Sequence, residues 1–321
     1  MKKVIINSFG GPDVLEFVST PLPKADKQQA LVKVHDIGIN PIDHKIRDGS
    51  SFVAKQLADK LPIGLGYEIS GEIVEIDDNQ AFKKGDRVCG LVGFLLNPCA
   101  YAEYAAADLT AITKIPDKIS YAQAACLPIA GLTALQALNL FGNLQDKKLL
   151  IQGGGGGVGH LAVQLAKIKG AEVITTASAQ KYPFLYDLGA DQCIDYKTQS
   201  IDTLISDIDG VLDLIGGQTG IHSLSVLKPS GLLVTIPTIT SEEVCQAAEK
   251  TGIKATKMVV KPDITMLNEL LDQLAKGDIE LHISEIFPLS NVAQAHEHLD
   301  KGNTKGKLCL SCYCQLDQNE S

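Results

Sequence analysis

The sequence predicts an α/β protein with two domains, one a small β-barrel and the other a doubly wound parallel sheet. Residues 1–120 contain many short apolar segments punctuated by Gly and Pro, which is typical of a barrel of short strands. From about residue 120, strand-like and helix-like segments alternate, which is typical of a parallel sheet. A chain of 321 residues is also long enough for two domains of ordinary size.

Strands in the first part are predicted from their apolar residues and from the turns between them. Residues 30–40 form a strand-like apolar run, and residues 69–76 alternate apolar and polar side chains, as a half-buried strand does. Residues 84–87 form a Lys-Gly-Asp-Arg turn, after which residues 88–92 resume a strand. A helical run rich in Ala and Leu follows at residues 121–137 and is interrupted by a proline and a glycine.

The second part is predicted as alternating strands and helices, and the chain then returns to the barrel. Strands are expected at residues 149–153, 172–177, 193–195, 210–215 and 231–236, and helices at residues 156–169, 179–188 and 219–227. After Pro262 the pattern predicts a helix at 266–277, a strand at 280–287, a helix at 291–301 and a strand at 307–310. The polar residues 315–321 are expected to be disordered.

A glycine-rich turn lies between the first strand and the first helix of the second part. Five consecutive glycines follow the apolar residues 149–151, and Gly154, Gly156 and Gly159 fill the pattern GxGxxG. Without Cβ atoms, the backbone can approach a pyrophosphate closely while the helix N-terminus offers free N–H groups. A flexible glycine loop is the alternative, but the strand at 172–177 completes a βαβ unit of about 30 residues. The turn therefore predicts a dinucleotide-binding site.

The end of the second strand indicates which dinucleotide binds. A site for NAD usually has an acidic residue there, which holds the 2′-hydroxyl of the ribose. This chain has Ser178 and Lys181 and no carboxylate in residues 176–181. A 2′-phosphate needs hydrogen-bond donors and positive charge, so the sequence favours NADPH. The alternatives are that Ser178 caps the following helix and that Lys181 is simply solvated.

Composition excludes several classes of function. The formal net charge of −9 and the pI of about 5.3 argue against nucleic acid as the main partner. No apolar run approaches the roughly 18 residues of a membrane span, and the N-terminus lacks the apolar stretch of a signal peptide. We therefore expect a cytoplasmic protein.

The eight cysteines are expected to be reduced in that compartment and to behave as small apolar residues. Cys309, Cys312 and Cys314 form the one cluster, which we interpret as a terminal strand with incidental thiols. Zinc binding would need further ligands from elsewhere in the chain. A partly exposed, redox-sensitive tail is the alternative.

Seven short motifs occur in a fixed order along the chain: Asn40-Pro41-Ile42-Asp43, the glycine-flanked segment 66–74, Gly85-Asp86-Arg87-Val88, the segments 100–104 and 124–134, Asp213-Leu214-Ile215-Gly216-Gly217, and Gly306-Lys307-Leu308. This ordered set resembles the medium-chain dehydrogenase/reductase superfamily, specifically its zinc-free branch of zeta-crystallin-like quinone oxidoreductases and alkenal/enone reductases. The resemblance implies a GroES-like β-barrel catalytic domain formed by residues 1–122 and 262–321. It also implies a doubly wound Rossmann nucleotide-binding domain at residues 123–261, and a homodimer.

The resemblance also bears on metal chemistry. Zinc-dependent relatives have a Cys where this chain has Asn40 and a His where it has Tyr67. An amide and a phenol are poor replacements for a thiolate and an imidazole at Zn²⁺, and Glu68 alone cannot hold the metal. We therefore expect no metal. Hydride transfer from NADPH to a quinone or an α,β-unsaturated carbonyl fits this expectation, because the negative charge of the product is delocalised and needs only hydrogen-bond donors.

By resemblance, site residues can be named on both domains. Asn40 would lie beside the nicotinamide and orient the cofactor or the acceptor carbonyl, and Lys45 would polarise the acceptor oxygen or bind a phosphate. The residues expected to hold NADPH are Gly154, Gly156, Gly157, Val158 and Gly159 at the pyrophosphate, Ser178, Lys181 and Tyr196 at the adenosine phosphate, Thr133, Ile215 and Ile236 near the ribose and nicotinamide, and Lys307 at a phosphate.

Several alternatives stay open at this point. Asn40 could serve only the turn before Pro41, and Lys45 could be an exposed helix residue. His296 and His298 are too close in sequence to share one helix face, and we expect them to face solvent rather than a metal. For the whole protein, the alternatives are a non-catalytic, crystallin-like NADPH-binding protein and an enoyl-thioester reductase.

Overall fold

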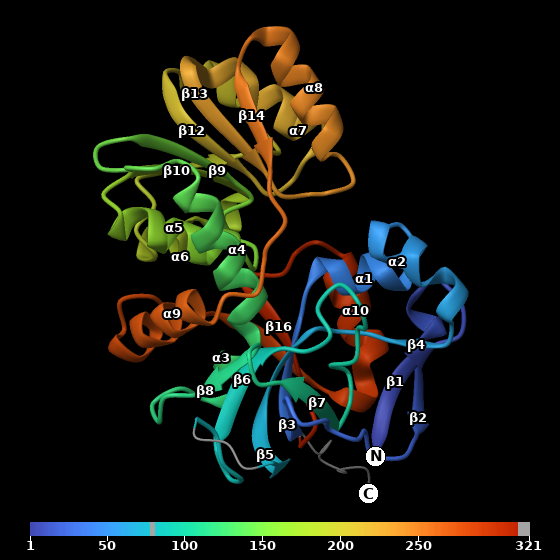
Figure 1. The fold of residues 1–321 in the computed structure, drawn as a ribbon. Coiled ribbons are helices and arrows are strands. Elements are labelled where there is room, and N and C mark those ends of the chain that lie inside the picture. Colours follow the sequence, from blue (N-terminus) through green and yellow to red (C-terminus); the bar gives the residue numbers. More distant parts are fainter. Residues whose placement is uncertain (78–80, 314–321) are drawn as a thin grey trace, which may run out of the picture. The chain divides into compact units, whose positions relative to one another are not determined.

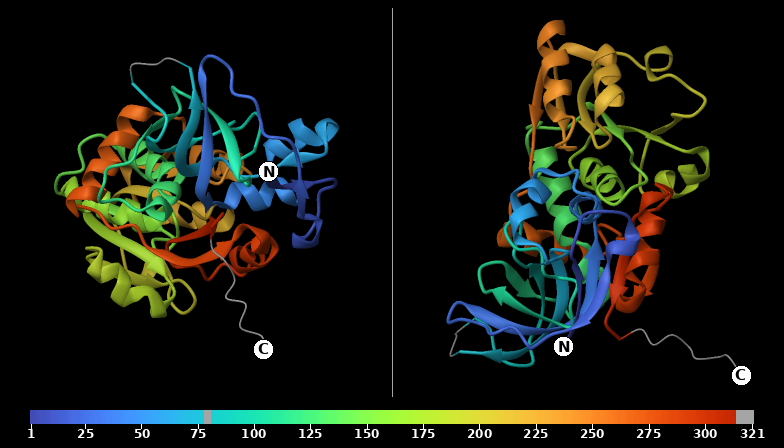
Figure 2. Two further views of the ribbon diagram at one scale, coloured as in Figure 1. Left: turned by 90° about the horizontal axis from the view of Figure 1, so that it is seen from below. Right: turned by 90° about the vertical axis from the view of Figure 1, so that its right-hand side faces the viewer.

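The computed structural model describes residues 1–77 and 81–313 and folds into two compact units. Unit 1 comprises Met1–Ile129 and Pro262–Ser321, and unit 2 comprises Ala130–Lys261. Both ends of the chain therefore belong to unit 1, as the blue and red segments of Figures 1 and 2 show. The sequence placed the first division at residue 122, within the helical region, and the second at Pro262. The expected tail at 315–321 and Cys314 lie outside the described residues.

Unit 1 is built on mostly antiparallel sheets of short strands, with one parallel pair, β15 and β16. Its larger sheet has seven strands in the order β15-β16-β3-β5-β6-β8, with β7 paired to β3. These strands are β3 (Gln29–Ile39), β5 (Glu68–Ile76), β6 (Arg87–Leu91), β7 (Tyr104–Asp108), β8 (Ile112–Lys114), β15 (Ile283–Pro288) and β16 (Lys307–Ser311). A smaller sheet has the order β2-β1-β4, formed by β1 (Lys2–Ile6), β2 (Glu16–Ser19) and β4 (Ile63–Gly64).

The C-terminal return completes unit 1, because β16 pairs antiparallel with β3 and places Leu308 opposite Ile39. This pairing brings Lys307 next to the end of β3, where the first helix begins. The helices of unit 1 are α1 (Pro41–Arg47), α2 (Phe52–Leu57), α3 (Tyr121–Cys126), α9 (Ile264–Lys276) and α10 (Val292–Asp300), with short 3-10 turns η1 (Pro12–Val14), η2 (Ala58–Lys60) and η6 (Leu289–Asn291). No helix among the described residues is both long and apolar enough to cross a lipid bilayer.

Unit 2 is a parallel sheet of six strands in the order β11-β10-β9-β12-β13-β14. The order reverses at β9, so helices cover both faces, as Figure 1 shows. The strands are β9 (Lys148–Gln152), β10 (Glu172–Ala177), β11 (Gln192–Asp195), β12 (Ile208–Asp213), β13 (Leu227–Thr235) and β14 (Lys254–Lys257). The helical segments are α4 (Pro128–Asn139), which begins at the end of unit 1, α5 (Gly159–Ile168), α6 (Tyr182–Asp187), α7 (Gly217–His222), α8 (Ser241–Thr251), η3 (Ala179–Lys181), η4 (Ile201–Thr203) and η5 (Ser223–Val226).

Two segments of unit 2 differ from the sequence-based expectation. The helix expected at 219–227 is the shorter α7 followed by η5, and β13 begins at Leu227 rather than at residue 231. The register of β13 against β12 shifts between Ile208 and Gly210 of β12. Pro229 lies in the first half of β13, and a proline inside a strand argues against a strand prediction, so this half was not predicted. Both α8 and β14 were missed. The sequence of β14 is Lys-Ala-Thr-Lys, which contains no apolar run because this edge strand has one neighbour.

Candidate active site

The candidate nucleotide site lies at the carboxyl edge of the unit 2 sheet. Parallel registers pair Gln152 with Thr176 and with Asp213, Ala177 with Asp195, and Asp213 with Thr235. The ends of β9 to β13 therefore meet at one edge, and the segments that follow them leave from the same place. These segments carry most of the predicted cofactor residues, namely Gly154–Gly159, Ser178, Lys181, Tyr196, Ile215 and Ile236.

The glycine-rich turn needs its glycines for two different reasons. A Cβ at Gly159 would collide with the backbone of Gly153 and Gly154, and a Cβ at Gly154 would collide with Thr175. These two glycines therefore permit close packing of the turn, the helix start and the sheet. At Gly156 the nearest atom to an added Cβ is the carbonyl oxygen of Gly153, 3.5 Å away, so this position is open. The turn thus leaves room at Gly156 where a pyrophosphate would approach.

Buried polar side chains hold the segments at this edge. Thr176 Oγ1 accepts a hydrogen bond from Gly153 N at 3.0 Å and donates to Gln152 Oε1 at 2.6 Å. Asp213 Oδ1 accepts from the backbone N–H groups of Ile215 (3.0 Å) and Gly216 (2.7 Å). Sequence reasoning missed these supports. The sequence feature that could have indicated the role of Asp213 is an acidic residue at the end of an apolar strand, shortly before two glycines.

The end of β10 suits a 2′-phosphate. Ser178 lies at the N-terminal end of η3, yet its side chain makes no capping hydrogen bond, which removes the alternative role considered for it. The side chain of Lys181 lies across the glycine-rich turn, since a Cβ at Gly155 would be 2.5 Å from Lys181 Cδ. A hydroxyl and a cation therefore flank the turn, and the residues present fit NADPH.

The remaining predicted cofactor residues differ in their exposure. Tyr196 is 60% exposed and Ile215 is 54% exposed, so both side chains are open to a ligand at this edge. Ile236 is half-buried after β13. Thr133 is buried within α4.

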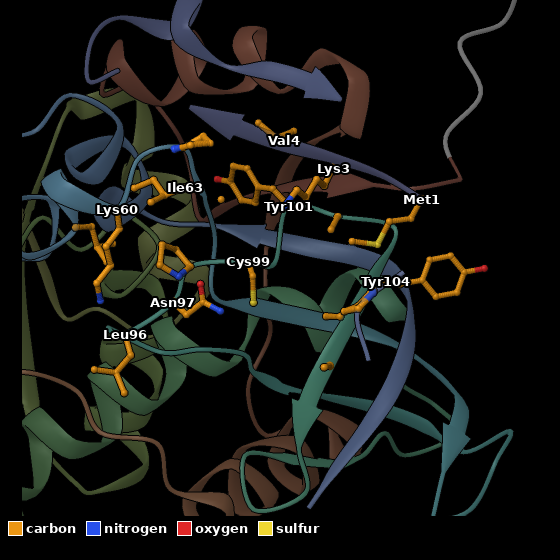
Figure 3. Close-up of a pocket in the computed structure, with 18 of the residues that line it drawn as sticks. Met1, Lys3, Val4, Lys60, Ile63, Leu96, Asn97, Cys99, Tyr101 and Tyr104 are labelled. Atoms are coloured by element: carbon orange, nitrogen blue, oxygen red, sulfur yellow. The ribbon is translucent and has the colours of Figure 1, made fainter. Parts of the chain in front are cut away.

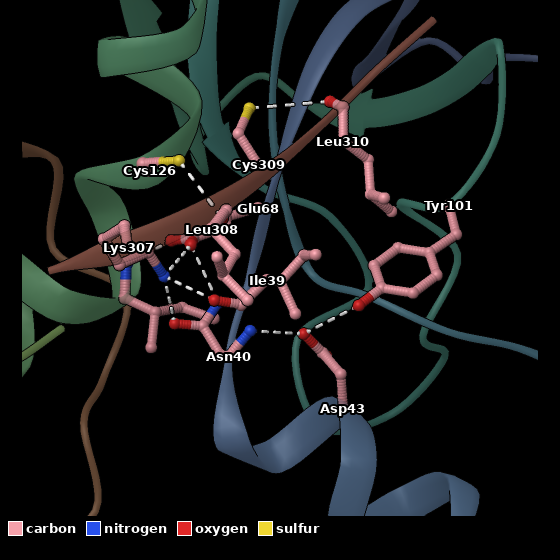
Figure 4. A network of polar contacts seen from close by, with 11 residues as sticks. Ile39, Asn40, Asp43, Glu68, Tyr101, Cys126, Lys307, Leu308, Cys309 and Leu310 are labelled. Carbon is pink, nitrogen blue, oxygen red and sulfur yellow. Dashed lines mark hydrogen bonds and ion pairs between the residues drawn. The ribbon is translucent and has the colours of Figure 1, made fainter. Parts of the chain in front are cut away.

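A buried polar network surrounds Asn40 in unit 1, at the junction of β3 and α1 (Figure 4). Asn40 Nδ2 donates to Glu68 Oε1 at 2.7 Å, and Lys307 Nζ donates to Asn40 Oδ1 at 2.5 Å and to Glu68 Oε1 at 2.8 Å. Ile129 N donates to Glu68 Oε2 at 2.7 Å. The carboxylate of Glu68 and the ammonium of Lys307 thereby fix the orientation of the Asn40 amide. One N–H of that amide takes no part in these hydrogen bonds of the described residues.

Lys307 is fully engaged in this network. Its ammonium also donates to the carbonyl oxygen of Ile39 at 2.8 Å, so three acceptors match its three protons, and the side chain is 2% exposed. Lys307 therefore has no proton left to donate to a phosphate, contrary to the expectation from the sequence. The sequence could not show this, because the partners of Lys307 come from segments more than 230 residues away.

The same network is unsuited to zinc. Asn40 Oδ1 and Glu68 Oε1 both accept from the ammonium of Lys307, and Glu68 Oε2 accepts from Ile129 N. Burial raises the pKa of the Tyr67 phenol, which therefore stays protonated and is a poor metal ligand. Among the described residues, no group of three or more His, Cys, Asp or Glu side chains is placed to hold a metal ion.

A hydrogen-bond chain connects Asn40 to α10. Asp43 Oδ2 accepts from Asn40 N at 2.8 Å and from the Tyr101 hydroxyl at 3.3 Å. The Tyr101 hydroxyl also lies 3.0 Å from His296 Nε2, and Arg47 lies 3.1 Å from His296 Nδ1. The expectation that His296 faces solvent was wrong, because its side chain is buried among these groups while His298 is half-buried. Helical spacing alone could not show that α10 packs on α1.

The direction of each hydrogen bond from Arg47 to Asp43 can be assigned. Arg47 can only donate, so His296 Nδ1 accepts and the proton of the neutral imidazole lies on Nε2. Burial lowers the pKa of His296 to about 3, which keeps the ring neutral. His296 then donates to Tyr101, and Tyr101 donates to Asp43. Burial raises the pKa of Asp43 to about 7, against the lowering effect of its hydrogen bond from Asn40.

Lys45 lies on α1, one turn beyond Asn40, and is half-buried. Burial lowers its pKa, while the carboxylate of Asp48 acts in the opposite direction. A lowered pKa makes a lysine a stronger acid than one in water. No hydrogen bond of the described residues joins the Lys45 side chain to the network around Asn40.

Comparisons with known proteins agree with this geometry. Residues 26–117 match the family described as "Alcohol dehydrogenase GroES-like domain", and residues 188–310 match "Zinc-binding dehydrogenase". The "Chloroplast envelope quinone oxidoreductase homolog" of Arabidopsis thaliana is 31% identical to this chain, over 95% of the chain and 96% of the relative. The chain belongs to the medium-chain dehydrogenase/reductase superfamily.

Two further members of the superfamily are similar over nearly the whole chain. The chloroplastic "NADPH-dependent alkenal/one oxidoreductase" of Arabidopsis thaliana is 32% identical over 97% of this chain and 79% of its own length. The structure of the quinone oxidoreductase from Coxiella burnetii is 45% identical, covers 97% of this chain and 99% of its own, and has a TM-score of 0.95. These similarities confirm the predicted GroES-like and Rossmann architecture. The region matched as zinc-binding, 188–310, contains neither Asn40 nor Tyr67.

Proposed function

We propose that this protein is an NADPH-dependent, zinc-independent oxidoreductase that transfers hydride to a quinone or an α,β-unsaturated carbonyl. The observation that carries the proposal is the edge of the unit 2 sheet, where Ser178 and Lys181 flank an open glycine-rich turn and no carboxylate ends β10. The similarity to an NADPH-dependent alkenal/one oxidoreductase and to quinone oxidoreductases supports the acceptor class.

In this reaction the protein contributes mainly binding, orientation and electrostatic stabilisation. NADPH, when bound, supplies the hydride. In unit 1, the remaining N–H of Asn40 is a donor for an acceptor carbonyl, where negative charge develops on oxygen. Lys45, with its lowered pKa, is a second donor that could also deliver the proton that the reduction consumes. Because a conjugated acceptor delocalises the charge, two such donors replace the Lewis acid that a simple ketone would need.

A paired titration tests this proposal. Purified protein is titrated with NADPH and with NADH, and oxidation of the reduced nicotinamide is then followed with 1,4-quinones and short alkenones. We expect preferential binding of NADPH and oxidation that depends on the acceptor. Lys181→Gln should weaken NADPH binding about 10- to 100-fold and leave NADH binding nearly unchanged, since a charge-assisted contact to phosphate contributes about 1.5–3 kcal/mol. Lys169→Gln, on the far end of α5, is the matched control.

Each other outcome has a defined meaning. Tight NADPH binding without turnover of any conjugated acceptor would favour the non-catalytic, crystallin-like alternative. Turnover confined to enoyl thioesters would favour the enoyl-thioester reductase. Equal loss of NADPH and NADH affinity in Lys181→Gln would contradict the role given to Lys181.

We further propose a cytoplasmic homodimer whose partner molecules are small substrates rather than nucleic acid. The net charge of −9 supports the exclusion of nucleic acid. In the described part of unit 2, β14 is an edge strand with a single neighbour, β13, which leaves one side of its backbone for pairing with a second copy. Sedimentation equilibrium of the purified chain measures this association directly.

A further inference from the structure

Asp213, the last residue of β12, is a fully buried carboxylate at the carboxyl edge of the unit 2 sheet. Polar groups from several segments converge on it. The pocket of unit 1 in Figure 3 differs in this respect, because it has a volume of about 600 Å³ but its lysines Lys3 and Lys60 lie well apart. The hydrogen bonds around Asp213 therefore indicate a more specific role than the pocket does.

Both carboxylate oxygens of Asp213 accept hydrogen bonds. Oδ1 accepts from the backbone N–H groups of Ile215 at 3.0 Å and Gly216 at 2.7 Å, and Oδ2 accepts from the Thr235 hydroxyl at 2.8 Å. In the described part of the chain, Asp213 forms no ion pair. Three donors from the protein thus replace the water that a buried carboxylate gives up.

The backbone of Asp213 holds a second segment. Its carbonyl oxygen accepts from the N–H of Ile236 at 3.0 Å. Ile215 is therefore bonded to the side chain of Asp213, and Ile236 is bonded to its backbone. One residue thereby fixes the spacing of the two isoleucines that the sequence predicts near the ribose and nicotinamide.

The side chain of Ile215 lies against the glycine-rich turn. A Cβ at Gly153, the first glycine of the turn, would be only 2.9 Å from Ile215 Cδ1. Ile215 is nevertheless 54% exposed, so it is open to a ligand at the turn. Because the nicotinamide and its ribose are joined to the pyrophosphate that the turn would hold, a side chain beside the turn is within their reach.

Helix α7 leaves space for the carboxylate at a glycine. A Cβ at Gly220 would collide with Asp213 Oδ2 and would be 2.9 Å from Val244 Cγ2. The φ of Gly220 is not positive, so this position needs glycine for space rather than for backbone conformation. A larger residue at 220 would displace either the carboxylate or the helix.

We propose that Asp213 is the positioning residue of the nicotinamide half of the cofactor site, a role that rests on the proposed function. Its carboxylate holds Ile215 at a fixed distance from Ile236, so that the ring and its ribose are bound in one orientation. Such preorganisation favours binding because the protein loses less freedom when the ligand arrives. The phosphates are assigned to other residues, so loss of the carboxylate should weaken only the nicotinamide half of the contact.

The test compares two ligands by isothermal titration calorimetry on the full chain without an acceptor. They are NADPH and 2′-phospho-ADP-ribose, which has the same phosphates and adenosine but lacks the nicotinamide. In Asp213→Ala we expect about tenfold weaker binding of NADPH and a change of less than about twofold for 2′-phospho-ADP-ribose. Asp213→Asn keeps an acceptor for both N–H groups and should recover most of the loss.

The matched control is Asp209→Ala, on the same strand at its opposite end. Asp209 accepts from the backbone N–H of Lys148 at 3.0 Å, far along β12 from Ile215, and its removal should change neither affinity. Amide hydrogen exchange of residues 214–217 in the cofactor-free chain, followed by mass spectrometry, should become faster in Asp213→Ala but not in Asp209→Ala.

Gly220→Ala tests the same carboxylate from α7 without removing any hydrogen-bonding group. It should reproduce the selective loss of NADPH affinity and the faster exchange of residues 214–217, and it decides the question if Asp213→Ala does not fold. Unchanged NADPH affinity in Gly220→Ala, or equal losses for the two ligands in either variant, would overturn the proposal. Asp213→Asn as weak as Asp213→Ala would also overturn it.

Failure of the proposed function gives different results. A parent chain that binds neither ligand would contradict the NADPH site, and the role of Asp213 with it. A parent chain that binds both ligands equally well would contradict only the role of Asp213, since the nicotinamide would then contribute nothing to binding. Selective loss of NADPH affinity in a chain that reduces no conjugated acceptor would support the role of Asp213 and overturn the proposed reaction.

Discussion

At the scale of the residue, Asn40 is held by charge. Its amide oxygen faces an ammonium and its amide nitrogen faces a carboxylate, and all three groups are buried. An amide that could rotate would present either a donor or an acceptor to a ligand. Lys307 and Glu68 remove this ambiguity, because the reversed amide would place its oxygen against Glu68 and its N–H groups against the ammonium. We infer that the ion pair serves to hold the amide in one orientation.

Removing Lys307 alone should therefore be more harmful than removing the whole pair. In Lys307→Met the Glu68 carboxylate stays buried without its cation, and we expect a loss of about 3–5 kcal/mol in the free energy of unfolding. Lys307→Met/Glu68→Gln should recover part of this loss, since no buried charge then lacks a partner. Urea denaturation of the two variants and the parent chain measures both effects. Equal stability of the single and double variants would show that Glu68 does not carry a buried charge.

At the scale of the element, α10 supports α1. The chain from His296 through Tyr101 to Asp43 ends on the backbone N–H of Asn40, at the start of α1. Arg47 is the first group of this hydrogen-bond series, and a guanidinium can only donate. This series of hydrogen bonds therefore cannot carry a proton from Arg47 to Asp43. Its role is to orient the side chains in it. It holds Asp43 in place as the acceptor of the Asn40 N–H.

Tyr101→Phe should shift the pH dependence of turnover. The Tyr101 hydroxyl donates to Asp43 and lowers the pKa of that carboxyl, so its removal raises the pKa further above about 7. If Asn40 is held by ionised Asp43, the acidic limb of the kcat/KM profile moves to higher pH by roughly one unit, the effect of one hydrogen bond to a charged group. Tyr104→Phe, a half-buried tyrosine outside the chain, is the control. A uniform loss of activity with an unmoved limb would indicate a purely structural role for Tyr101.

The sequence predicted most elements of unit 2, though not α8 and β14, and the segments at its carboxyl edge, because their signals are local. A strand, a glycine-rich turn and a helix are contiguous, and parallel pairing brings the strand ends together without further information. The supports of Asn40 in unit 1 were not predictable in the same way. Glu68, Tyr101 and His296 reach it from β5, from the segment before β7 and from α10. Nothing in a single sequence indicates which buried polar residues will meet across such distances.

At the scale of the whole molecule, two buried groups act on stability in opposite directions as the pH changes. His296 has a pKa of about 3 in the folded state and 6.5 as its ordinary value, so between these values the unfolded chain binds more protons and stability rises with pH. Asp43 has a pKa of about 7 when folded and an ordinary value of 3.8, so the folded chain binds more protons and stability falls as pH rises. The two windows overlap between 3.8 and 6.5, and the parent chain should show little net dependence from this pair.

Single substitutions should separate the two contributions. In His296→Gln the rising contribution is lost, so the stability of the variant relative to the parent should fall as pH increases from about 4 to 6.5, by an amount of the order of 3 kcal/mol. In Asp43→Asn the falling contribution is lost, and the relative stability should rise over the same range. The free energy of unfolding is measured by urea denaturation at several pH values, and Thr113→Val, which removes a polar group from another buried contact of unit 1, is the control with no pH-dependent difference. Parallel pH curves for His296→Gln and the parent would mean that His296 titrates normally in the folded protein, and the order of donors from Arg47 to Asp43 would then be wrong.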